Sequence, residues 1–163
     1  MTIWPAIAVL APPALGIARA AIDDLIELAT KKTPAYTVKS LRDRSVVQLQ
    51  LAQAEAKLGA ARAYLHDVFG RAYAEAVEGK SITMEYKCKA QLAATHAILA
   101  SAEAVDLVHA AVGASGIRRE YRFQKYFRDV HVITQHAFTS ASRFESVGQI
   151  LMGLQPEWSF FAF

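Results

Sequence analysis

The sequence predicts an all-helical domain in which four amphipathic helices form an up-down-up-down bundle. Two observations carry this prediction. Apolar residues recur at steps of three and four along four long stretches, and alanine, the best helix former, is abundant while runs of Val, Ile and Thr are few. The stretches are joined by short links, which favour antiparallel neighbours. A chain of 163 residues has the size of one domain, and we expect a single domain over residues 1–163.

The first two expected helices cover residues 13–32 and 41–78. Pro12 and Pro13 suit the first turn of the first helix, where a missing N–H costs little. The second helix carries the clearest pattern, and Gly79 is a natural stop for it. Its expected core positions are Val47, Leu51, Ala54, Leu58, Ala61, Leu65, Val68 and Ala72.

The third and fourth expected helices cover residues 83–112 and 121–148. Ser81 and Thr83 offer N-cap oxygens to the third helix. Its apolar face is rich in alanine, so we expect a neighbouring helix to approach it closely. The fourth helix has its expected core face at Phe123, Phe127, Val130, Ile133, Thr134, Ala137 and Ala141. The aromatic tail, residues 151–163, is not expected to remain in water.

Charge and composition argue against several partners. The net charge is +3, and the basic residues occur as pairs and not as a long run. A nucleic-acid surface needs a clustered basic stripe, so we expect no nucleic-acid binding. The apolar stretch 3–18 is interrupted by prolines, lacks a basic leader and is shorter than the roughly 18–20 residues that span a membrane. We interpret it as a protein-facing segment, with a secretory signal as the alternative.

The sequence offers little support for a metal site. The single cysteine, Cys88, excludes an intrachain disulfide and a Cys-based metal site, and it fits a reducing cytoplasm. A di-metal bundle needs two Glu-x-x-His motifs, whereas the chain has only the Asp-x-x-His of Asp106 and His109. We therefore predict no metal site and expect ordinary surface or hydrogen-bonded histidines. These are His66, His96, His109, His131 and His136.

One stretch combines features that could bind an anion. The turn Gly113-Ala-Ser-Gly116 leads into a helix that carries Arg128-Asp129 and then His136. Backbone N–H groups at such a helix start can hold an anion. The alternative is that Arg128 and Asp129 form a pair that locks the helix to its neighbours.

The order of these features resembles the C-terminal helical domain of the acyl-CoA dehydrogenase superfamily, from about Ala14 to Gly148. In that family a Gly-Gly-x-Gly turn precedes an Arg-Asp pair, as residues 113–116 and 128–129 do here. The stretch around residues 41–52 resembles the region where members place an arginine near the flavin of a neighbouring subunit. The resemblance implies flavin contacts, with FAD or FMN, from Arg42 or Arg44 and from Gly113 and Gly116.

The family's catalytic motif differs in this chain. Acyl-CoA dehydrogenases carry Tyr-Glu-Gly-Thr after the Arg-Asp pair, and the matching positions here are His136-Ala137-Phe138-Thr139. Ala137 replaces the glutamate that serves as the base in many members, which disfavours an acyl-CoA dehydrogenase. His136 instead resembles the flavin-dependent monooxygenase branch, whose members take reduced flavin from a separate reductase. The resemblance implies that His136 faces the flavin ring and assists proton transfer to a phenol-like substrate.

The resemblance also implies partners. Family members carry a helical domain and a β-domain ahead of this bundle, and neither is present. We expect a truncated piece, a broken reading frame or a free-standing bundle, without independent catalysis. The domain builds the tetramer core in the family, so we expect a homodimer or homotetramer in the cytoplasm. The alternative to a flavoenzyme domain is a non-catalytic oligomerisation or interaction module.

Overall fold

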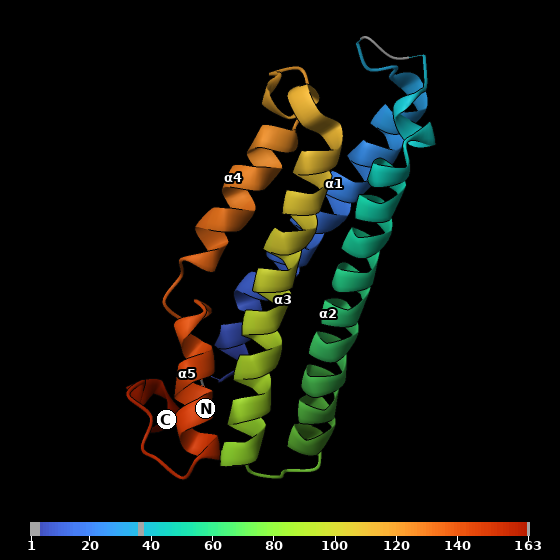
Figure 1. Ribbon diagram of the computed structural model, residues 1–163. Coiled ribbons are helices and arrows are strands. Elements are labelled where there is room, and N and C mark those ends of the chain that lie inside the picture. Colours follow the sequence, from blue (N-terminus) through green and yellow to red (C-terminus); the bar gives the residue numbers. More distant parts are fainter. Residues whose placement is uncertain (1–3, 36–37, 163) are drawn as a thin grey trace.

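The protein is a bundle of helices in the computed structural model, which describes residues 4–35 and 38–162 (Figure 1). Within these ranges every regular element is a helix, which confirms the all-helical prediction. Ile3, residues 36–37 of the expected loop and Phe163 of the tail lie outside the described residues. The α-helices are α1 (Ala11–Lys31), α2 (Ser45–Val77), α3 (Met84–Val112), α4 (Phe123–Thr134) and α5 (Ser142–Leu151). The short 3-10 helices are η1 (Trp4–Leu10), η2 (Leu41–Asp43), η3 (Gly113–Ile117) and η4 (Ser159–Ala162).

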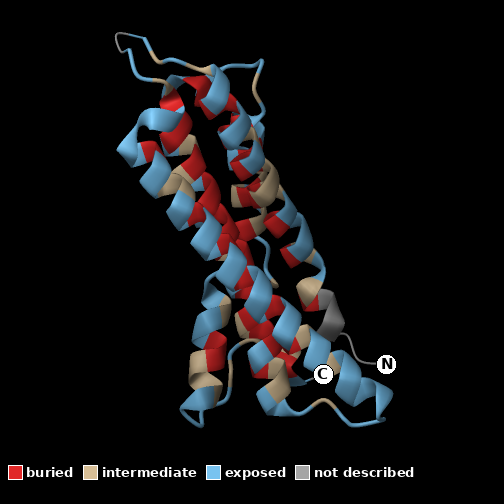
Figure 2. Ribbon diagram, turned by 90° about the vertical axis from the view of Figure 1, so that its right-hand side faces the viewer, coloured by how far each residue is buried: buried red, intermediate tan, exposed pale blue. Residues whose placement is uncertain are grey.

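Helix α3 is the centre of the bundle. It packs against α1, α2, α4 and α5, and the buried residues follow its length in Figure 2. Ala93, Ala97 and Ala104 are completely buried, so the expectation of close approach at an alanine-rich face is confirmed. The helical segment Met84–Ile117 is long and apolar enough to cross a membrane, judged by length and composition only. Its central position in the bundle explains this apolar composition.

The predicted patterns of the first three helices match the observed burial. Of the expected core positions on α2, Leu51 and Ala72 are half-buried and the other six are buried. The two prolines occupy the start of α1. The Thr83 hydroxyl accepts the Tyr86 N–H at 3.2 Å and caps α3. Gly79 adopts φ +74° directly after α2, a left-handed conformation that glycine tolerates best.

The prediction of one continuous fourth helix over residues 121–148 is wrong. Helix α4 ends at Thr134 and α5 begins at Ser142. The completely buried Gln91 of α3 donates from Nε2 to the Phe138 carbonyl at 2.8 Å, which gives that carbonyl a partner outside any helix. At the end of α4 the Thr134 hydroxyl donates to the His131 carbonyl at 2.7 Å, a local bond of the kind that competes with helical hydrogen bonds. The expected core positions Ala137 and Ala141 are consequently exposed.

Candidate functional site

Two of the predicted cofactor residues, Arg44 and Gly113, line one groove of about 340 Å³. It lies where α1 ends, α2 begins and α3 turns into η3. Lys32, Arg44 and Arg118 bring three cationic side chains to this groove, and none of the described residues that line it is acidic. A groove lined in this way favours an anionic ligand.

The sequence did not single out Arg118 or Lys32 as members of this groove. Lys32 directly follows α1. Its ammonium donates to the Ser115 hydroxyl and lies 3.5 Å from the Val112 carbonyl oxygen. Burial, and then the neighbouring Arg118, lower the pKa of Lys32. Among the described residues it has no carboxylate partner. A bound anion would supply the missing countercharge.

The two glycines of the turn have different roles in the fold. Gly113 has φ +57° and ψ −133°, a backbone conformation that side chains disfavour, and it lines the groove. Gly116 is buried, and a Cβ there would lie 2.8 Å from Nε2 of His109. The structure therefore supplies a packing reason for Gly116, while its contact with a flavin stays a prediction.

The two candidate arginines occupy different surroundings. Arg42 is exposed on η2, with Nε 3.8 Å from the Asp43 carboxylate, and it does not line the groove. Arg44 precedes α2 and lines the groove, without an acidic partner among the described residues. The structure thus brings Arg44, and not Arg42, together with Gly113.

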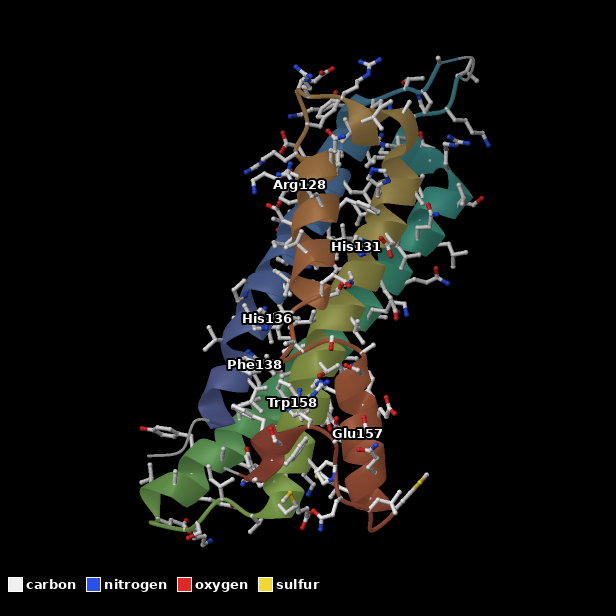
Figure 3. All side chains as sticks on the ribbon, turned by 90° about the vertical axis from the view of Figure 1, so that its left-hand side faces the viewer. Arg128, His131, His136, Phe138, Glu157 and Trp158 are labelled. Atoms are coloured by element: carbon white, nitrogen blue, oxygen red, sulfur yellow. The ribbon has the colours of Figure 1, made fainter. Side chains whose placement is uncertain are left out.

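His136 lies in the break between α4 and α5 (Figure 3). Its ring is exposed, and Nδ1 accepts the Phe138 N–H at 3.3 Å. With Nδ1 acting as an acceptor, a neutral ring carries its proton on Nε2. The twelve residues of α4 separate η3 from this segment, which corresponds to about 18 Å of helix. Within one chain, the predicted catalytic residue His136 is therefore separated from the groove that Arg44 and Gly113 line.

Arg128 and Asp129 do not lock α4 to its neighbours. Asp129 accepts from Lys125 and lies 3.3 Å from Arg128, and all three residues belong to α4. Lys125 first, and Arg128 after it, lower the pKa of Asp129. The interpretation of this pair as a link between helices is wrong, because both side chains lie along the surface of one helix.

The polar link between α4 and α1 is made instead by Tyr126. Its hydroxyl donates to the Asp24 carboxylate at 2.9 Å, and Arg122 lies 3.6 Å from the same group. Burial, and then the Asp24 carboxylate, raise the pKa of Tyr126 to about 12. Only the protonated phenol can donate this hydrogen bond.

Folding is therefore expected to lose stability in alkali through Tyr126. Since the folded-state pKa is raised, the contribution is complete below about pH 10, the usual tyrosine pKa, and is lost as pH rises toward 12. Urea unfolding measured at intervals between pH 9 and 12 would show this fall, and Tyr126→Phe would flatten it. Tyr73→Phe, an exposed tyrosine on α2, serves as the control. An identical pH slope in Tyr126→Phe and the unchanged protein would contradict this assignment.

The histidines make ordinary packing and hydrogen-bonding contacts. Asp106 lies 2.8 Å from Nε2 of His131, and the His109 and Phe127 ring centroids lie 4.9 Å apart with their planes tilted by 46°. Asp106 and His109 thus have separate neighbours. Within residues 4–35 and 38–162, no group of three or more His, Cys, Asp or Glu side chains could hold a metal ion.

These features define a helical domain with a cation-lined groove at one end and a histidine at a helix break. The sequence model for "Acyl-CoA dehydrogenase, C-terminal domain" matches residues 8–141. The chain belongs to this family.

The chain is similar in sequence to proteins named as monooxygenases and hydroxylases. The chain is 32% identical over 148 residues to an indole-3-acetate monooxygenase of Pseudomonas putida, a match that covers 91% of the chain and 38% of that protein. It is 28% identical over 149 residues to the oxygenase component of p-hydroxyphenylacetate 3-hydroxylase from Acinetobacter baumannii, covering 88% and 34%. The chain thus spans less than two fifths of the length of these two relatives.

Solved structures show the same fold. XiaF from a Streptomyces species, in complex with FADH2 and glycerol, matches with a TM-score of 0.88 and 20% identity, covering 95% of this chain and 40% of XiaF. A 3-HSA hydroxylase from Rhodococcus sp. RHA1 matches with a TM-score of 0.84 and 22% identity, covering 94% and 40%.

Proposed function

We propose that this chain acts as the C-terminal domain of a flavin-dependent monooxygenase. In this proposal the groove at Arg44 and Gly113 holds the phosphate part of a flavin, and His136 faces the ring of a flavin. The observation that carries the proposal is the groove itself, where three cations meet without a carboxylate among the described lining residues. The names of the similar proteins support the same class of activity.

The residues of the groove fit a flavin phosphate. FAD and FMN both carry phosphate oxygens, which accept charge-assisted hydrogen bonds from Lys and Arg. Lys32 and Arg44 have no carboxylate partner among the described residues, so a phosphate would not have to displace one. Gly113 has no side chain, and a ligand could therefore approach its backbone closely.

The second part of the proposal concerns proton transfer at His136. A bound reduced flavin would supply the activation of oxygen. His136 would hold or move a proton at Nε2, because Nδ1 is occupied by the Phe138 N–H. Ala137, exposed beside it, offers no carboxylate for abstraction of a proton from a thioester. The pair of residues therefore favours hydroxylation of an aromatic substrate over acyl-CoA dehydrogenation.

We also propose that the chain associates with itself. About 18 Å of α4 separates the groove from His136. This separation supports an arrangement in which each copy binds one flavin through its groove and faces a neighbour's flavin with His136. The exposed apolar side chains of Leu49 and Val77 on α2 are suited to contact between copies.

Flavin titration tests the proposal directly. The purified chain would be titrated with reduced and oxidised FAD and FMN, followed by flavin fluorescence and by sedimentation. We expect a dissociation constant in the micromolar range, about 8 kcal/mol of binding free energy. Arg44→Gln removes one charge-assisted contact and is expected to weaken binding about tenfold or more.

Two matched variants sharpen this experiment. Arg42→Gln, outside the groove, and Arg71→Gln, near the opposite end of α2, should bind flavin as the unchanged protein does. Equal weakening in all three variants would show that only general charge attracts the flavin. Absence of flavin binding in a chain that still forms a dimer or tetramer would overturn the proposal and favour the non-catalytic oligomerisation module.

A further inference from the structure

The C-terminal tail folds back onto the break between α4 and α5. After α5, Gly153 adopts φ +76° and the chain reverses its direction. Gln149 then makes two hydrogen bonds to the tail. Its backbone carbonyl accepts the Leu154 N–H at 2.8 Å, and its side-chain oxygen accepts the Glu157 N–H at 3.0 Å. The matched family region ends at residue 141, so the tail lies beyond it.

The end of the tail is anchored in the core of the bundle. The Phe161 side chain is 1% exposed. The ammonium of Lys87, at the beginning of α3, donates to the Phe161 carbonyl at 3.0 Å. The hydrogen bond ties the end of the tail to α3, and the burial of the ring places it in the core of the bundle.

Between these two fixed points, the tail presents aromatic rings to the break. Trp158 and Phe160 lie with their ring centroids 6.0 Å and 5.1 Å from that of Phe138. Phe138 in turn lies 5.3 Å from the His136 ring. Figure 3 shows Phe138 between His136 and Trp158. Rings at these separations attract each other beyond their area burial.

Arg143 ties the same rings to α5. Its guanidinium carbon lies 3.9 Å above the Trp158 ring. Nε and Nη1 of Arg143 are buried without a hydrogen-bond partner, and burial lowers the pKa of this arginine. A desolvated cation gains more from an aromatic face than an exposed one does. Nη2 donates to the Ser142 hydroxyl at 3.0 Å, so removal of Trp158 would leave the buried Nε and Nη1 without the aromatic face that compensates them.

Gln91 of α3 holds the backbone of the break. Its side-chain amide, completely buried on α3, donates to the Phe138 carbonyl. The backbone of Phe138 is therefore held by α3, while its ring is held by the tail. The residues around it, 135–141, are called the His136 segment below.

We propose that residues 153–162 form a clamp that fixes the His136 segment, with Trp158 as its positioning residue. The proposal rests on the proposed function only for the role of His136 at a flavin. The clamp itself consists of contacts within the chain and can be measured without flavin. Trp158 acts on His136 through Phe138 and does not itself contact a reacting group.

Hydrogen exchange and histidine NMR signals of the full chain test the clamp. In Trp158→Ala we expect amide exchange in the His136 segment to become about tenfold faster, because local opening no longer breaks the aromatic and cation–π contacts. The ring-proton signals of His136, assigned with His136→Gln, should also shift. Trp158→Phe keeps an aromatic face and should restore most of the protection. Leu154→Ala, an exposed change within the tail, is the matched control.

Several results would decide against the clamp. Faster exchange in α2 and in the His136 segment to the same degree would mean that Trp158 supports only general stability. If Trp158→Ala does not fold, Arg143→Met, which removes the cation and leaves the ring, replaces it and must give the same local pattern. Unchanged His136 signals in a folded variant would also overturn the proposal. Failure of flavin binding with a local exchange effect would refute the proposed function and retain the clamp.

Discussion

Phe161→Ala is expected to lower the free energy of unfolding by about 3–5 kcal/mol, the usual cost of emptying a buried aromatic site. The ring is 1% exposed and belongs to the core cluster, although it lies two residues from the end of the chain. Urea unfolding followed by circular dichroism measures the change. Removal of this ring should also free the clamp, so the midpoint should fall together with local protection of the His136 segment.

Phe144→Ala is the matched control for this loss. Phe144 lies on α5 with 37% of its surface exposed, so the same chemical change removes far less buried area. We expect it to cost less than half as much. A loss of less than about 1 kcal/mol in Phe161→Ala would contradict the anchored tail, since that amount is typical of an average substitution.

Ala97→Leu is expected to destabilise the fold by about 3 kcal/mol, at the upper end of the range for overpacked cores. Ala97 is completely buried on α3, the helix that packs against all the other α-helices. Three additional carbon atoms at this position would force neighbouring helices apart or push side chains out of their preferred rotamers. Thermal and urea unfolding of the variant give the loss in stability.

Ala63→Leu, on the exposed face of α2, tests whether leucine itself or its burial causes the effect. Both residues are good helix formers, and an exposed change of this kind usually alters stability by less than about 0.5 kcal/mol. Equal stability of the two variants would contradict the close packing of α3.

The periodic helices could be predicted from local information because each residue's burial follows from its place in a repeating pattern. The core positions of α2 and the cap at Thr83 are examples. The prediction of a continuous fourth helix was wrong because it, too, relied on local information. The apolar periodicity of this stretch continues through Ala137 and Ala141. The neighbouring sequence does not indicate that Gln91, 47 residues earlier, binds the Phe138 carbonyl.

For the candidate site, too, the sequence supplied the residues and the tertiary structure supplied their grouping. The resemblance to a flavoenzyme family supplied Arg42 or Arg44, Gly113, Gly116 and His136 as candidates. Their grouping follows only from the tertiary structure, since residues from the end of α1, the start of α2 and the end of α3 meet at the groove. Lys32 had no signal of its own, because a lysine at a helix end is explained by the helix dipole alone.

The sequence by itself determined the helical class, the alanine-rich third helix and the family to which the chain belongs. These depend on composition, on short-range periodicity and on residues in a fixed order. The tertiary structure alone decided where the fourth helix breaks, which arginine reaches the groove and how the tail packs on Phe138. Each of these depends on contacts between residues far apart in the chain, whose geometry exists only after the helices have packed.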